Sequence, residues 1–124
     1  MGFWTPVMAA LGAALRFTDR TRPWAGWEPA GGGRPLFIVT VPFDGAAARP
    51  GNGVMVAFEV EDRATVDRVH ALALSLGGVS EGAPGLRPEY HADYYGAYVR
   101  DPAGNKVAVA CHRPLAGQSP SALV

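Results

Sequence analysis

The residues that could carry metal or acid–base chemistry gather late in the chain. Glu89, His91 and Asp93 stand at alternate positions, a spacing that places side chains on one face of a strand, and His112 follows them. Carboxylates and imidazoles are common ligands of divalent cations, and histidine also titrates near neutral pH. Polar residues that face solvent on an edge segment give the same pattern more often, so we favour a solvated segment over a ligand set.

Nucleophilic chemistry has less support. No serine lies in a nucleophile-elbow context, and the adjacent residues Cys111 and His112 point to opposite faces of a strand, which argues against a thiolate–imidazole pair. Cys111, the single cysteine, is expected to be a buried small hydrophobic residue. Arg87 or Arg100 could bind a substrate carboxylate with two hydrogen bonds, although exposed arginines without such a role are commoner.

A β-hairpin positions most of these residues. Two β-prone runs, Tyr95–Arg100 and Lys106–His112, flank the turn sequence Asp101-Pro102-Ala103-Gly104-Asn105, which has Gly where φ must be positive. Alternation along the second run gives it a branched apolar face and a small face. The branched face carries Val107, Val109 and Cys111, and the small face carries Ala108, Ala110 and His112.

The remaining elements follow from periodicity and capping. Phe3, Val7, Ala10 and Leu11 at helical spacing predict a first helix, for which Thr5 is a candidate cap, Pro6 suits the first helical position and Gly12 is the stop. Asp62 is a good cap for a second helix that ends at Gly77. Strands are predicted over residues 15–19, 24–29 and 54–60. The run Leu36–Val41 is apolar on both faces, so we expect a central strand buried on both sides.

Composition excludes several classes of protein. The 124 residues suit a single domain, and a formal net charge of zero with 18% charged residues gives no field that would attract nucleic acid or an anionic membrane. No run approaches the roughly twenty apolar residues of a membrane helix. The N-terminus also lacks the pattern of a signal peptide. We therefore expect a cytoplasmic protein.

The sequence contains motifs that resemble one family over most of its length. The series G-A-P-G-L-R-P-E-Y-H-A-D-Y-Y-G-A-Y-V-R-D-P-A-G-N-K-V, residues 82–107, resembles the last half of vicinal oxygen chelate proteins, the superfamily of glyoxalase I, bleomycin-resistance proteins and extradiol dioxygenases. Phe3-Trp4-x-Pro6-Val7-Met8 is similar to that family's first helix, residues 42–45 to the turn after its fourth strand, and residues 51–58 to its fifth strand.

The resemblance implies an α+β fold with two β-α-β-β-β modules that form a curved mixed sheet around a concave pocket. A single glyoxalase-like domain would span residues 1–114, with module one over 1–48 and module two over 51–114, and a polar tail would follow over 115–124. The resemblance places a first strand of module one before the first helix, where only Met1 and Gly2 stand, so we expect module one to lack this strand. Either translation starts further upstream, or the sheet is one strand short and a partner chain covers its edge.

The resemblance also implies where metal ligands would stand. Metal-dependent members use a His on the first strand of each module and a Glu on the last strand of one or both modules. Here Met55 stands at the second His position and Ala108 at the last Glu position, while the first His would lie on the missing strand. A catalytic divalent ion needs about three protein ligands, which a thioether and a methyl group cannot supply. We therefore expect neither a metal nor a cofactor.

The resemblance, with strand alternation, predicts a pocket with small walls and an aromatic rim. The predicted pocket residues are Trp24, Trp27, Ile38, Thr40, Met55, Ala57, Tyr90, His91, Tyr94, Tyr98 and Ala108. The expected function is binding of a small, partly apolar molecule by a homodimer, as in the bleomycin-resistance branch. One alternative is a metal-dependent lyase or dioxygenase that recruits ligands from His91, Glu89 or a partner chain. In another, the aromatic side chains fill the concavity themselves and the domain binds no ligand.

Overall fold

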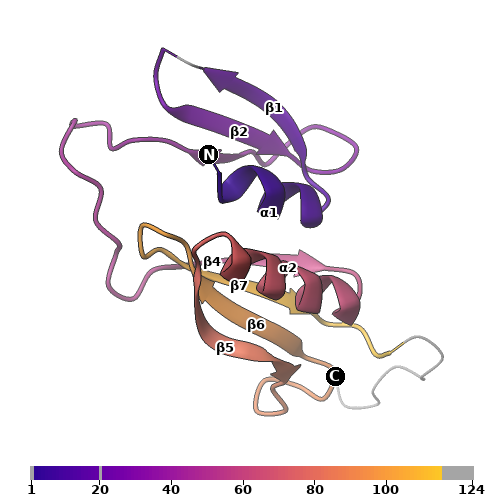
Figure 1. The fold of residues 1–124 in the computed structure, drawn as a ribbon. Helices are drawn as coiled ribbons and strands as arrows, with labels where there is room; N and C mark the ends of the chain where they lie inside the picture. Colours follow the sequence, from indigo (N-terminus) through magenta and orange to yellow (C-terminus); the bar gives the residue numbers. More distant parts are fainter. Residues whose placement is uncertain (1, 20, 116–124) are drawn as a thin grey trace.

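The computed structural model describes residues 2–19 and 21–115 (Figure 1). Its elements, in chain order, are α1 (Trp4–Ala10), β1 (Ala14–Asp19), β2 (Trp24–Glu28), β3 (Phe37–Val39), β4 (Met55–Val60), α2 (Arg63–Ser75), β5 (Val79–Leu86), β6 (Tyr95–Arg100) and β7 (Lys106–Cys111). The strands form a three-stranded sheet of order β1-β2-β3 and a four-stranded sheet of order β4-β7-β6-β5. This is the predicted α+β class, and it matches a glyoxalase-like fold.

The hairpin at the centre of the sequence prediction is confirmed. β6 and β7 pair antiparallel from Tyr95 opposite Cys111 to Arg100 opposite Lys106. The Asp101 carboxylate closes the turn, since its Oδ1 accepts the backbone N–H groups of Ala103 and Asn105. β4 pairs parallel with β7 on the other side, so the second sheet is mixed.

Helix α2 also begins and ends as predicted. The Asp62 side chain accepts a 2.7 Å hydrogen bond from the backbone N–H of Thr65, which satisfies one of the free donors of the first turn. Val66, Val69 and Ala73 recur on one side of the helix and are each at most 1% exposed. They pack α2 against the second sheet, and Gly77, with φ +94°, ends the helix.

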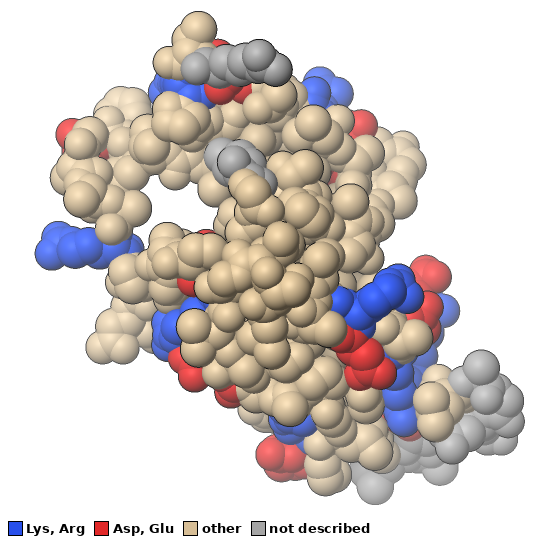
Figure 2. Space-filling model, viewed as in Figure 1, with Lys and Arg blue, Asp and Glu red and all other residues tan. Residues whose placement is uncertain are grey.

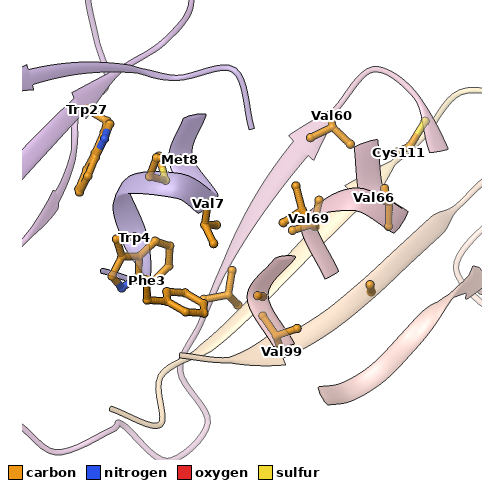
Figure 3. Close-up of a cluster of buried hydrophobic side chains, with 14 of the residues drawn as sticks. Phe3, Trp4, Val7, Met8, Trp27, Val60, Val66, Val69, Val99 and Cys111 are labelled. Atoms are coloured by element: carbon orange, nitrogen blue, oxygen red, sulfur yellow. The ribbon is translucent and has the colours of Figure 1, made fainter. Parts of the chain in front are cut away.

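One hydrophobic core joins the two modules, as the close-up in Figure 3 shows for its buried side chains. The Phe37 ring of β3 lies 5.1 Å from the Phe58 ring of β4, and the Trp4 ring of α1 lies 5.0 Å from Phe37. Helices α1 and α2 also contact each other. The faces of both sheets that meet the helices therefore contribute to the same core.

The expectation of a central strand over Leu36–Val41 is wrong. The strand there is only Phe37–Val39, and it lies at the edge of its sheet, beside β2. Phe37 and Val39 pack against the core, but Ile38 points away and is 44% exposed. The central strand of this sheet is β2, in which Ala25 and Trp27 are almost fully buried.

Neither helix of the described residues has both the length and the apolar character that a membrane crossing requires.

Candidate functional site

The register of the second sheet places Met55 and Ala108 on the same face. Side chains directly opposite each other on paired strands share a face, and Ala57 is opposite Ala108 while Met55 is opposite Lys106. Tyr98 of β6 is the other cross-strand neighbour of Ala108. We call this side, which points away from α2, the open face. Its residues on strands β4, β6 and β7 are Met55, Ala57, Glu59, Gly96, Tyr98, Arg100, Lys106, Ala108 and Ala110.

The alanines of β7 on the open face, Ala108 and Ala110, have small side chains that are covered by their neighbours. Ala108 and Ala110 are 1% and 5% exposed although they point away from the helix, so larger neighbouring side chains must lie over them. Met55, on the edge strand β4, remains 46% exposed, and Tyr98 is half-buried. The face therefore combines a floor of methyl groups with a phenol ring and a thioether.

The loop between β5 and β6 adds aromatic residues to one end of this face. The hydroxyls of Tyr94 and Tyr98 are 3.0 Å apart, and the Tyr94 ring packs edge-on against those of Tyr90 and His91, with centroids at 4.9 and 5.7 Å. Burial first, and then the hydrogen bond with Tyr94, raises the pKa of Tyr98. A hydrogen bond with Tyr98 likewise raises the pKa of Tyr90.

The same loop places His91 against His112, the residue that follows β7. Nε2 of His91 lies 2.8 Å from Nδ1 of His112, and the two rings are stacked. The backbone N–H of Asp93 donates to Nδ1 of His91 at 3.2 Å. Since that nitrogen accepts, the proton of His91 is on Nε2, which donates to His112.

The expected alternation of Glu89, His91 and Asp93 along an edge strand is not observed. Residues 87–94 form an irregular loop with turns, in which Glu89 is exposed. His91 and Asp93 interact through the backbone N–H of Asp93 and do not share a strand face.

Two cations flank Tyr98. The Arg87 guanidinium carbon and the Lys106 ammonium nitrogen each lie 5.6 Å from the centre of its ring. From the sequence, Arg87 is predicted only as a carboxylate ligand or an ordinary exposed arginine, and Lys106 has no predicted role. The alternation that places Ala108 and Ala110 on one face applies equally to Lys106, so the signal was present.

The predicted pocket residues divide into two groups. Met55, Ala57, Tyr98 and Ala108 lie on the open face, and Tyr90, His91 and Tyr94 lie in the adjoining loop. Trp24 and Ile38 instead lie on the first sheet, and Thr40 follows β3. The Trp24 ring packs against Phe17 and Arg22, and its Nε1 donates a 3.3 Å hydrogen bond to Oδ2 of Asp19. Trp27 is 2% exposed and belongs to the hydrophobic core.

Two clefts are lined by residues of both modules. The larger, of about 950 Å³, is lined by the end of α1, by the edge of β4 from Val56 to Val60, and by Trp27 and Phe37. The smaller, of about 270 Å³, is lined by Ile38, Thr40 and Lys106 among others. Of the predicted pocket residues on the second sheet, only Ala57 lines either cleft.

The residues present do not fit a divalent metal ion. Met55 and Ala108 offer no nitrogen or oxygen ligand, and His91 and His112 are only two ligands. Within residues 2–19 and 21–115, no group of three His, Cys, Asp or Glu side chains is placed to hold a metal ion.

Solved structures resemble this chain closely. It is similar to a glyoxalase/bleomycin resistance protein from Albidiferax ferrireducens T118, with 30% identity, a TM-score of 0.74, and coverage of 91% of this chain and 86% of that one. It also resembles a glyoxalase/bleomycin resistance protein/dioxygenase family enzyme from Burkholderia phytofirmans PsJN (18% identity, TM-score 0.57, 86% and 88% covered). A third similar structure is TioX from Micromonospora sp. ML1, with 19% identity, a TM-score of 0.55, and coverage of 86% of this chain and 84% of that one. No protein-family model matches the sequence, and no curated protein matches it.

Proposed function

Because the chain belongs to the vicinal oxygen chelate superfamily of glyoxalases, bleomycin-resistance proteins and dioxygenases, we propose that it is a metal-free member that binds a small, partly apolar molecule. The observation that carries the proposal is the shared face of Met55 and Ala108. These residues stand where the resemblance places a His and a Glu. A thioether and a methyl group turn a chelating centre into an apolar floor.

The proposed ligand lies on the open face, against Met55 and Ala57 and beside the Tyr94 and Tyr98 rings. Apolar area removed from water contributes roughly 25 cal/mol per Å², and stacking on a tyrosine adds to this. Sequestration of such a ligand needs no reaction. We therefore place the domain with binding proteins rather than with metal-dependent enzymes.

A screen with a metal assay tests this function. Protein purified without chelator is expected to contain no stoichiometric divalent ion by elemental analysis. At least one compound of a metabolite and antibiotic panel is expected to raise the melting temperature, since a ligand that binds only the folded state stabilises it. Ala57→Trp should abolish that shift, whereas Ala71→Trp, on the exposed side of α2, should leave it intact. A stoichiometric ion bound at the open face would refute the proposal.

The proposed assembly is a homodimer that covers the free edge of β4. Val54 and Met55, at the start of this edge strand, are 64% and 46% exposed, and an unpaired strand edge with apolar side chains tends to pair with another chain. Val54→Lys should shift the sedimentation coefficient to that of a monomer. Val79→Lys is the matched control, since Val79 is 60% exposed on the other edge strand, β5. Equal sedimentation of all three proteins as dimers would exclude this edge.

The second candidate is a metal-dependent lyase or dioxygenase, and the histidine pair favours it. The two imidazole nitrogens lie 2.8 Å apart and could move apart to hold one ion, with Glu89 or a partner chain as the third ligand. This reading predicts a bound divalent ion that His112→Gln removes. Metal content of wild type and His112→Gln therefore separates the two candidates.

A further inference from the structure

Two positive charges share one tyrosine ring on the open face. The charged groups of Arg87, in the loop after β5, and of Lys106, on β7, each lie 5.6 Å from the centre of the Tyr98 ring. Each cation gains from the negative face of the ring, but the two repel each other. All three side chains are half-buried, so water screens this repulsion less than at a fully exposed site.

Among the residues that the structure describes, neither Arg87 nor Lys106 forms an ion pair with a carboxylate. The ion pairs formed among residues 2–19 and 21–115 are Arg16–Glu28, Arg100–Glu81 and Arg113–Glu61. Glu59 is on the open face, but it lies opposite Ala110, four cross-strand pairs beyond the pair of Met55 and Lys106. Arg100, the cross-strand partner of Lys106, lies on the same face and is paired with Glu81. Arg87 and Lys106 are therefore the cations beside Tyr98 that no ion pair among the described residues neutralises.

Two glycines and a backbone carbonyl of β5 form the site in which the Arg87 guanidinium lies. One terminal nitrogen donates a 2.8 Å hydrogen bond to the backbone carbonyl of Ala83. A Cβ atom added at Gly82 would stand 3.2 Å from one terminal nitrogen, and one at Gly85 would stand 3.1 Å from the other. Gly82 is the cross-strand partner of Tyr98 and therefore lies on the open face. Because Gly82 and Gly85 have no side chains, the Arg87 guanidinium can occupy the space beside them.

We propose that Arg87 and Lys106 bind a carboxylate, so that the ligand of the open face is a small organic carboxylate with an apolar body. This inference rests on the proposed function, whose ligand it specifies. The carboxylate neutralises both cations beside Tyr98, and guanidinium groups bind carboxylates with two parallel hydrogen bonds. The apolar body then extends over Met55, the cross-strand partner of Lys106, towards Ala57.

Calorimetric titration with a matched pair of probes tests the inference. Phenylacetate carries the carboxylate, and phenylacetamide is its neutral analogue of the same shape. We expect phenylacetate to bind about tenfold more tightly than phenylacetamide, and high salt to reduce this difference. Lys106→Met and Arg87→Gln should each weaken phenylacetate binding about fivefold to tenfold without changing phenylacetamide binding, and Lys106→Arg should retain most of the affinity.

Arg22→Gln is the control, because Arg22 stacks on Trp24 of the first sheet at 4.9 Å without facing the second sheet's open face. It should leave both affinities unchanged. Equal binding of the two probes, or phenylacetate binding that is insensitive to Lys106→Met and Arg87→Gln, would overturn the inference and leave the proposed function standing. Binding of neutral panel compounds without any binding of phenylacetate would do the same. If no compound of the panel binds, the proposed function itself fails.

Discussion

The indole nitrogen of Trp4 donates a 3.1 Å hydrogen bond to Oδ2 of Asp101, across 97 residues of sequence. Both side chains are buried, at 7% and 6% exposure. Asp101 also closes the β6–β7 turn, so one carboxylate joins the first helix to the hairpin that carries the candidate site. In Figure 1, α1 lies between the first sheet and the second module, where such a link can hold the modules together.

Removal of this carboxylate is expected to be costly. Asp101→Ala leaves the Trp4 and Asn105 donors unsatisfied, which should lower the free energy of unfolding by about 2–4 kcal/mol. Trp4→Phe removes one hydrogen bond and some packing, so it should lower the free energy of unfolding by about 1–3 kcal/mol. Urea unfolding followed by circular dichroism measures both. Asp44→Ala is the control, since Asp44 accepts a backbone N–H in an exposed turn, and a loss for Asp101→Ala no larger than this control's would contradict the prediction.

Gly96 lies beneath the Tyr94 ring. A Cβ atom at Gly96 would stand 2.8 Å from Cε1 of Tyr94, so Gly96→Ala should push the ring away from Tyr98. We expect a loss of about 1–2 kcal/mol in unfolding free energy and weaker binding by the open face. In a double-mutant cycle, Tyr94→Ala should remove most of the added cost of Gly96→Ala, and strictly additive effects would show that the two residues do not compete for space.

Local signals allowed much of the fold to be predicted. Turn residues 101–105, the Asp62 cap and the apolar stripe of α2 act over a few residues, so the sequence around them determines the outcome. The position of Leu36–Val41 depends instead on its neighbours in the sheet. Its Ile38 lies at an edge, and no local property distinguishes an apolar edge strand from a buried central one.

The candidate site was less predictable for the same reason. Alternation placed Met55, Ala57, Tyr98 and Ala108 on one face, because register follows the hydrophobic pattern. The position of the loop residues depended on how residues 87–94 turn back. Contacts such as His91 with His112 and Arg87 with Tyr98 join segments whose distance the sequence does not specify.

His70 predicts a loss of stability at mildly acidic pH. Burial lowers its pKa below 6.5, and its ring bonds to the Ser80 hydroxyl at 2.9 Å. The unfolded chain therefore takes up a proton more readily than the folded one, so this contribution is complete above the ordinary pKa and declines as the pH falls below it. His70→Gln should reduce the difference between unfolding free energies at pH 8 and pH 5. An NMR titration that gives His70 a pKa at or above 6.5 would contradict the assignment.

Tyr98 predicts the opposite dependence at alkaline pH. Burial and the hydrogen bond with Tyr94 raise its pKa above 10, so the folded protein holds the phenol proton more tightly than the unfolded chain. The stability linked to this group is complete below about pH 10 and is lost as the pH rises through the folded pKa.

Tyr98→Phe should therefore reduce the decline in unfolding free energy between about pH 9 and pH 11, measured with urea at each pH. Some decline will remain, since the pKa values of Tyr90 and Tyr95 are also raised. A carboxylate bound between Arg87 and Lys106 would disfavour the phenolate further, so phenylacetate should shift the 295 nm absorbance titration of wild type upwards and leave that of Tyr98→Phe unchanged. Equal shifts in the two proteins would place the bound carboxylate away from Tyr98.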